Sequence, residues 1–262
     1  MSRLSIQKVR SAAAVALLLS IFLLAACGGA GPTELTIVAS EYAFEVPEEI
    51  PAGTVSIRLE NTGQEPHHAQ LARLNDGVTM DQFMAALQAG ETEALALISL
   101  EGGPGVVAPG TTSTATTSNL RPGQYVVLCF VGDPEGVPHL AHGMIATINV
   151  TGEPEVQEVE ADGTVQLADF SITLPENLEA NQVWEIDNDG QQPHELAFIQ
   201  LAEGATMDDV AAFFTAPPSG PPPFTFAGGL QGIMPGSTAY LETNFEPGNY
   251  VALCFIPDPA TG

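Results

Sequence analysis

Residues that bind soft metal ions are concentrated in one short segment. Between Cys129 and Met144, which offer a thiol and a thioether, lie two imidazoles, His139 and His142. A further imidazole, His67, follows an Asn-Thr-Gly turn upstream. Sulfur ligands suit Cu(I) and imidazole suits Cu(II), and two His, one Cys and a distant axial Met form an electron-transfer arrangement for copper. These residue types therefore point to metal binding with one-electron chemistry.

The pattern resembles that of the cupredoxins, the family of small blue copper proteins. Members have an early His after an Asn-rich turn and a late Cys-x(n)-His-x(3–4)-Met loop. Plastocyanin-like members have Pro-His at the first ligand, as in Pro66-His67. The loop here is Cys-x9-His-x4-Met, longer than in plastocyanins and close to that of copper nitrite reductases. The resemblance implies one copper per complete domain, bound by His67, Cys129, His139 and Met144.

Two of these ligand positions have a competing candidate. His68 adjoins His67, and because successive strand residues point to opposite faces, only one of them can bind the metal. Pro-His recurs at His194 in a matching segment, which favours His67. His142 competes with His139, but only His139 gives the His-x4-Met spacing of the family. The alternative for His142 is a histidine near the edge of the metal site, where an electron could leave.

The sequence after residue 33 divides into two matching halves. Glu65-Pro66-His67 matches Gln192-Pro193-His194, and residues 121–130 match residues 246–255, with Leu-Cys-Phe in both. Ordered self-similarity of this kind indicates a duplicated structural unit. We therefore predict a first domain at 34–152, a linker at 153–163 and a second domain at 164–262. The resemblance covers the first of these well and the second in part.

Each half is predicted to be an all-β, Greek-key sandwich of cupredoxin type with one short helical insertion. The 26 Gly and 21 Pro are spread along the chain, which suits short strands joined by turns. In the insertion, Thr79 and Gln82 form a capping-box pattern. We interpret this helix as a packed connection rather than a functional element. Strand-like runs occur at residues 35–39, 55–59, 125–130 and 145–150.

The second half carries part of the ligand pattern. It contains His194 and Cys254, and the sequence ends where a second His and a Met would follow. We interpret this pair as the remnant of a second site, either because the sequence is incomplete at its C-terminus or because the domain has lost its metal. A disulfide between Cys129 and Cys254 and an inert buried thiol in each half are the alternatives. Equivalent positions in tandem domains usually lie far apart, which counts against the disulfide.

The N-terminus is typical of a bacterial lipoprotein signal. A basic start precedes an apolar run at residues 12–26, which is too short for a comfortable membrane span. The run ends in Leu-Ala-Ala-Cys, similar to a lipobox, in which the Cys becomes the lipidated first residue. A plain secretory signal or a short N-terminal anchor is the alternative. We predict an extracytoplasmic protein on the cell membrane, with signal peptide 1–26, a lipid on Cys27 and a tether at 27–33.

Charge bears on the partners. The chain has 32 acidic and 6 basic residues, and three of the basic ones lie in the signal. Phosphate binding needs clustered Lys and Arg, so nucleic acid is not expected as a partner. An acidic surface aids solubility, and it also suits a basic redox partner protein.

The resemblance predicts a cell-envelope electron carrier that is not an enzyme. In copper oxidases and nitrite reductases built from cupredoxin repeats, a His adjoins the type 1 Cys. Here Cys129 is flanked by Leu128 and Phe130, and Cys254 has the same neighbours. Two alternatives stand beside the carrier: a copper-free cupredoxin-like module for binding or surface structure, and a protein that stores or transfers copper.

Overall fold

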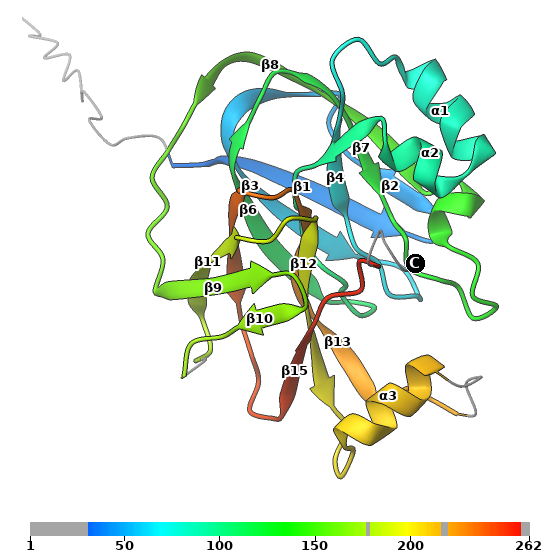
Figure 1. Ribbon diagram of the computed structural model, residues 1–262, viewed down its shortest axis with the longest axis vertical. Coiled ribbons are helices and arrows are strands. Elements are labelled where there is room, and N and C mark those ends of the chain that lie inside the picture. Colours follow the sequence, from blue (N-terminus) through cyan, green and yellow to red (C-terminus); the bar gives the residue numbers. More distant parts are fainter. Residues whose placement is uncertain (1–30, 177–178, 216–219, 258–262) are drawn as a thin grey trace, which may run out of the picture. The chain divides into compact units, whose positions relative to one another are not determined.

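Strands make up most of the regular structure in the computed structural model of this protein (Figure 1). The structure describes residues 31–176, 179–215 and 220–257. The all-β sandwich class predicted from the sequence is confirmed. The predicted signal peptide and Cys27 lie outside the described residues. No helix in the described part is long and apolar enough to cross a membrane.

The first half of the chain packs two groups of strands around an apolar core. β3 pairs in parallel with β1 and antiparallel with β6, whereas β7 pairs antiparallel with β4 and β8. Fully buried side chains from both groups, such as Ile37, Ile57, Val127 and Ile148, form the core. The strands are β1 Thr33–Ser40, β2 Ala43–Glu45, β3 Glu49–Asn61, β4 Gln70–Leu74, β5 Ile98–Leu100, β6 Thr112–Leu120, β7 Gly123–Leu128 and β8 Ile145–Glu155.

β3 connects the two groups because its register changes at Gly53. Residues 49–51 pair with β8, and residues 55–60 pair with β1 and β6. Gly53 has φ +123°, and a Cβ there would lie 2.1 Å from the carbonyl oxygen of Glu155. Strands that change layers at such irregularities form the corners of sandwiches. A side chain at Gly53 would obstruct this corner.

The helical insertion of the first half consists of two helices, α1 Met80–Ala89 and α2 Glu91–Leu95, where the sequence predicted one. Thr79 caps α1 as predicted. Its hydroxyl accepts a hydrogen bond from the Gln82 N–H at 3.2 Å, and the Gln82 side chain accepts one from the Thr79 N–H at 2.9 Å. Phe83 is buried in an apolar cluster with residues of β4 and β7. This packing fits the connecting role predicted for the insertion.

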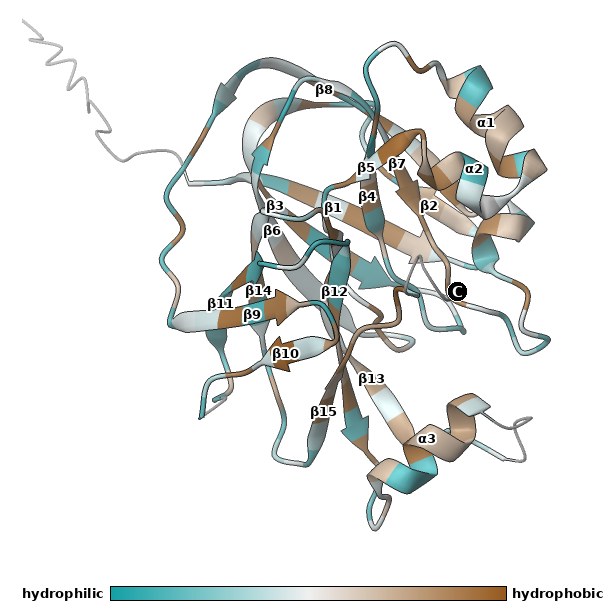
Figure 2. Cartoon of the chain, in the orientation of Figure 1, coloured by the Kyte–Doolittle hydropathy of each residue, from teal (hydrophilic) through white to brown (hydrophobic). Residues whose placement is uncertain are grey.

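The second half repeats much of the strand pairing. β9 pairs in parallel with β11, as β1 does with β3, and β12 pairs antiparallel with β15, as β4 does with β7. Figure 2 shows hydrophobic residues along β7 and β15, the strands that lead to Cys129 and Cys254. The elements are β9 Gly163–Ala168, β10 Ser171–Thr173, β11 Gln182–Asn188, β12 His194–Leu201, α3 Met207–Thr215, β13 Phe224–Ile233, β14 Thr238–Thr243 and β15 Tyr250–Leu253.

The two halves share hydrogen-bonded strands. β6 pairs with β14, so one continuous sheet includes strands of both halves. Residues 101–107, between β5 and β6, bond to residues 67–71 on one edge and to residues 228–233 on the other. β8 continues to Glu155, so the start of the predicted linker is strand rather than linker. The chain from Gly31 onward forms one compact unit, and its division into two domains stays a prediction.

Candidate metal centre

Three of the four predicted ligands meet in the core of the first half. His67 lies shortly before β4, Cys129 directly follows β7, and His139 begins the 3-10 helix η1 His139–His142. The Nδ1 atoms of His67 and His139 lie 3.1 Å apart. The Sγ atom of Cys129 lies 3.5 Å from Nδ1 of His139 and 4.0 Å from Nδ1 of His67. All three side chains are fully buried.

The triangle formed by these three atoms fits a single metal ion. The point equidistant from them lies roughly 2.1 Å from each atom, inside the ~2.0–2.3 Å range that imidazole nitrogen and thiolate sulfur take to Zn²⁺, a comparable divalent ion. A thiolate with two imidazoles is a donor set that copper favours. Among the described residues, these three side chains are the group whose donor atoms converge. The cluster therefore supports copper as the cofactor.

Backbone hydrogen bonds hold the loop from Cys129 to Met144 in place. The Leu140 N–H donates to the carbonyl oxygen of Cys129 at 2.8 Å, and the Met144 N–H donates to that of His139 at 3.0 Å. Gly143 ends η1 with φ 95°, a left-handed conformation that glycine adopts without strain. Met144 is fully buried in the same apolar cluster as Cys129. The fold therefore places the fourth predicted ligand in the core that holds the other three.

A buried amide shapes the turn before His67. The Asn61 Nδ2 donates to the carbonyl oxygens of Glu65 at 2.8 Å and Val107 at 3.1 Å, and its Oδ1 accepts a hydrogen bond from the N–H two residues further on. Asn188 makes the same three kinds of bond in the second half. The sequence indicated a turn here, but the bond to Val107 depends on a segment 46 residues away.

The two competing histidines lie outside the cluster. The His68 side chain points toward the backbone of Phe130, and its Nε2 accepts a hydrogen bond from the Phe130 N–H at 2.8 Å. Burial, helped by the neighbouring imidazoles, lowers the pKa of His68 to about 3. His142 binds the Asp133 carboxylate through Nε2 at 2.8 Å and stacks on Tyr42. Each histidine therefore has a structural contact of its own.

Burial sets the charge of the ligands before a metal binds. It raises the pKa of the Cys129 thiol to about 11. Burial also lowers the pKa of His67 to about 4, with repulsion from His139 as the next cause. The metal-free site at neutral pH therefore holds a protonated thiol beside a neutral His67. Because a metal binds the thiolate, loading the site must release the thiol proton.

Two carboxylates face the outer nitrogens of the imidazoles, and the sequence interpretation missed both. The Glu65 Oε2 lies 2.9 Å from Nε2 of His139. The Glu41 Oε1 lies 4.0 Å from Nε2 of His67. The edge of Tyr42 also covers His139, with ring centroids 5.1 Å apart. The one local signal was the Glu-Pro-His order around Glu65. In a chain with so many acidic residues, a Glu at this place is not distinctive.

In the second half, the predicted pair His194 and Cys254 come together without a third ligand among the described residues. The Cys254 Sγ lies 3.8 Å from Nδ1 of His194. The Asp169 Oδ1 lies 3.0 Å from Nε2 of His194. Cys129 and Cys254 are both free thiols, so they do not form the disulfide considered as an alternative.

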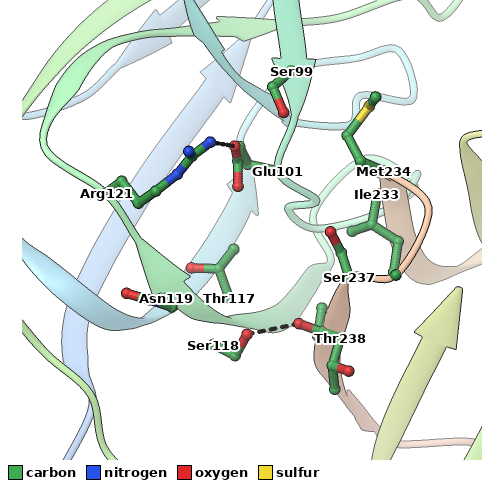
Figure 3. Close-up of a pocket in the computed structure, with 12 residues that line it drawn as sticks. Ser99, Glu101, Thr117, Ser118, Asn119, Arg121, Ile233, Met234, Ser237 and Thr238 are labelled. Carbon is green, nitrogen blue, oxygen red and sulfur yellow. Dashed lines mark hydrogen bonds and ion pairs between the residues drawn. The ribbon is translucent and has the colours of Figure 1, made fainter.

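A polar pocket of about 460 Å³ lies between residues of the two halves (Figure 3). Arg121 and Glu101 face each other there at 3.6 Å, and the Ser118 hydroxyl donates to the Thr238 carbonyl oxygen at 2.8 Å. The lining residues include none of the predicted ligands and no imidazole or thiol. The pocket is therefore chemically distinct from the metal centre.

No protein-family model and no curated protein matches this chain. Among solved structures, the reduced auracyanin of the photosynthetic bacterium Roseiflexus castenholzii is 23% identical over 47% of this chain and 100% of its own length, with a TM-score of 0.33. Auracyanin A of Chloroflexus aurantiacus, described as a "blue" copper protein, is 23% identical over 46% and 100%, with a TM-score of 0.31. The strand architecture and the buried His-Cys-His cluster both agree with the predicted resemblance to the cupredoxins.

The prediction that the protein is not an enzyme is wrong as it was stated. Copper enzymes are also among the similar structures. A multicopper oxidase is 16% identical over 85% of this chain and 83% of its own, with a TM-score of 0.27. The copper nitrite reductase of Thermus scotoductus is 14% identical over 85% and 57%, with a TM-score of 0.24. The Leu-Cys-Phe neighbourhood of the thiol is therefore no ground for excluding catalytic activity.

Proposed function

We propose that this protein transfers electrons through a type 1 copper ion that His67, Cys129, His139 and Met144 would hold. The observation that carries the proposal is the convergence of two imidazole Nδ1 atoms and one thiol Sγ at 3.1–4.0 Å in a fully buried cluster. Bound at this point, copper supplies one-electron redox chemistry.

The chain contributes rigidity and exclusion of water. Cys129 and His139 belong to one hydrogen-bonded loop, and His67 pairs with Val107 through two backbone hydrogen bonds, at 2.9 and 3.2 Å. Interiors of this kind are close-packed and resist displacement. A site that moves little between two oxidation states favours fast electron transfer, because little energy is spent on rearrangement.

Copper loading of the Cys129→Ala and Cys254→Ala variants tests the assignment. We expect the wild type and Cys254→Ala to bind Cu(II) with an intense absorption band on the order of 600 nm, from the thiolate–copper bond of such sites. Cys129→Ala should lose the band, because the thiolate is the ligand that gives the colour. A Cys254→Ala variant that stays colourless and keeps the Cys129 thiol free after loading would exclude the type 1 site.

Reversible reduction and reoxidation of the loaded protein distinguishes an electron carrier from a copper-storage protein, because storage does not require the copper to change its oxidation state.

The proposed location is the outer face of a cell membrane, with a lipid on Cys27. It is supported by the lipobox-like sequence and the basic start of the chain. A redox partner with a basic surface is proposed from the formal net charge of −26.

A further inference from the structure

We propose that Glu65 is a positioning residue of the metal centre, which holds the outer nitrogen of His139 and favours the oxidised state of the metal. This inference rests on the proposed copper site. It gives a function to a carboxylate that the ligand pattern of the sequence does not include.

The contact between Glu65 and His139 is direct and sheltered. The Glu65 Oε2 lies 2.9 Å from Nε2 of His139, a usual distance for a charge-assisted hydrogen bond. The His139 side chain is 0% exposed and that of Glu65 is 24% exposed, so the carboxylate lies between the imidazole and the solvent. Tyr42 covers the ring from another side. The outer nitrogen of His139 therefore has a fixed acceptor instead of water.

The contact selects one tautomer of His139. A ring nitrogen that binds a metal carries no proton, so a neutral His139 ligating through Nδ1 has its proton on Nε2. Glu65 accepts a hydrogen bond from that N–H and thereby stabilises this tautomer and ring orientation. A carboxylate in this position also makes the imidazole a stronger donor. A stronger donor and a nearby negative charge stabilise Cu(II) more than Cu(I).

The turn fixes Glu65 without help from a metal. The Asn61 Nδ2 donates to the Glu65 carbonyl oxygen at 2.8 Å, and the Glu65 N–H donates to the Glu41 carboxylate at 3.2 Å. Pro66 follows, and its ring restricts the backbone of Glu65. Because the backbone is already ordered, placing the carboxylate on His139 costs only side-chain entropy.

The same type of contact recurs in the second half. The Asp169 Oδ1 lies 3.0 Å from Nε2 of His194, and it also accepts a hydrogen bond from the Gln191 N–H at 2.9 Å. Glu41 has the matching place in the first half, 4.0 Å from Nε2 of His67. A carboxylate toward an outer imidazole nitrogen is therefore present in both halves at the position of Glu41 and Asp169. The position of Glu65 holds Gln192 in the second half, where the described residues offer no third ligand.

The test compares E65Q and E65A with the control E135Q. Glu135 is exposed on the ligand loop. Its charge, like that of Glu65, acts on Tyr42, whose pKa is raised first by burial and then by these carboxylates. E135Q thus removes a negative charge from the same neighbourhood and leaves the His139 contact intact. E65Q removes the charge but keeps an acceptor oxygen, and E65A removes both.

In the full chain, we expect E65A to weaken Cu(II) binding about 10–100-fold, E65Q to weaken it less, and E135Q to leave it unchanged. Cu(I) binding should change less than Cu(II) binding. Each tenfold loss of affinity for Cu(II), with the affinity for Cu(I) unchanged, raises the reduction potential of the copper by about 59 mV. Competition with chelators and direct voltammetry measure these quantities. Equal potentials in E65A and E135Q would overturn the proposal.

A second measurement needs no copper. Long-range ¹H–¹⁵N NMR of the metal-free chain reports which nitrogen of His139 is protonated. The wild type and E135Q should show the proton on Nε2, whereas E65A should show both tautomers. If the wild type binds no copper but gives this pattern, the proposed function fails and the Glu65 contact stands. An unchanged His139 tautomer in E65A would mean that Glu65 does not position the ring.

Discussion

At the scale of single residues, the candidate metal centre depends on groups one contact beyond the predicted ligands. Asn61 fixes the turn before His67, and Glu65 holds the outer nitrogen of His139. His68 stabilises the start of the Cys129 loop by accepting a hydrogen bond from the Phe130 N–H. A substitution of any of these residues should alter the site without removing a ligand.

Glu195 is the residue at which the second half departs most clearly from this arrangement. It takes the place of His68, and its Oε1 accepts a hydrogen bond from the Phe255 N–H at 2.8 Å, as His68 does from Phe130. Burial raises the pKa of Glu195 to about 7 from the ordinary value of 4.5. The half with His194 and Cys254 therefore buries a carboxyl group where the first half buries a neutral imidazole.

Glu195→Gln should make the protein less sensitive to pH. The folded state holds the Glu195 proton more tightly than the unfolded state, so the free energy of unfolding falls as pH rises from about 4.5 to 7, by at most roughly 3 kcal/mol. Gln keeps the acceptor oxygen and cannot ionise. Urea denaturation between these pH values should show a smaller fall in E195Q. The exposed control E203Q should follow the wild type, and parallel curves for all three proteins would contradict the prediction.

At the scale of elements, the segment 101–107 links residues 67–71, which include the predicted ligand His67, to the second half. His67 pairs with Val107 on one edge of this segment. On the other edge the Gly105 N–H donates to the Gly229 carbonyl oxygen at 2.7 Å. Gly229 has φ +139°, and a Cβ there would lie 2.0 Å from the Leu196 carbonyl oxygen. Close backbone approach at this point is what allows β13 to bond to both neighbours.

Gly229→Ala should therefore destabilise the chain by roughly 2 kcal/mol or more, from left-handed strain and displaced backbone. Gly236→Ala is the matched control. Gly236 also has a positive φ, of +75°, but no atom lies within 4 Å of the added Cβ. Denaturation of both variants measures the difference, and amide exchange at His67 should accelerate in G229A alone. Equal losses of stability would show that the close approach is unimportant.

At the scale of the whole molecule, the outstanding property is charge. A formal net charge of −26 creates a field that attracts cations and basic proteins over a distance set by ionic strength. Strands of both halves belong to one sheet. The second half can therefore hold the first half in place, in addition to any role that it has as a separate domain.

Electron transfer to a positively charged small haem protein, used as a probe, should slow about tenfold between ~10 mM and ~300 mM salt, because screening weakens long-range attraction. Stopped-flow mixing of the reduced, copper-loaded protein with the oxidised probe measures the rate. A negatively charged probe should react more slowly at low salt and speed up as salt is added. Rates that ignore salt with both probes would rule out electrostatic steering.

The sequence by itself determined the β class, the recurrence of the Pro-His and Leu-Cys-Phe motifs, the capping of α1 by Thr79 and the donor types of the candidate site. These features are local or repetitive: a period-two pattern, a capping box, and a loop in which Cys129, His139 and Met144 are close along the chain. The tertiary structure decided which imidazole nitrogens converge, that His68 turns away, and that Glu65 meets His139 from 74 residues away. One carboxylate among 32 acidic residues has no local signature, because only the packing of distant strands selects which of them reaches an imidazole.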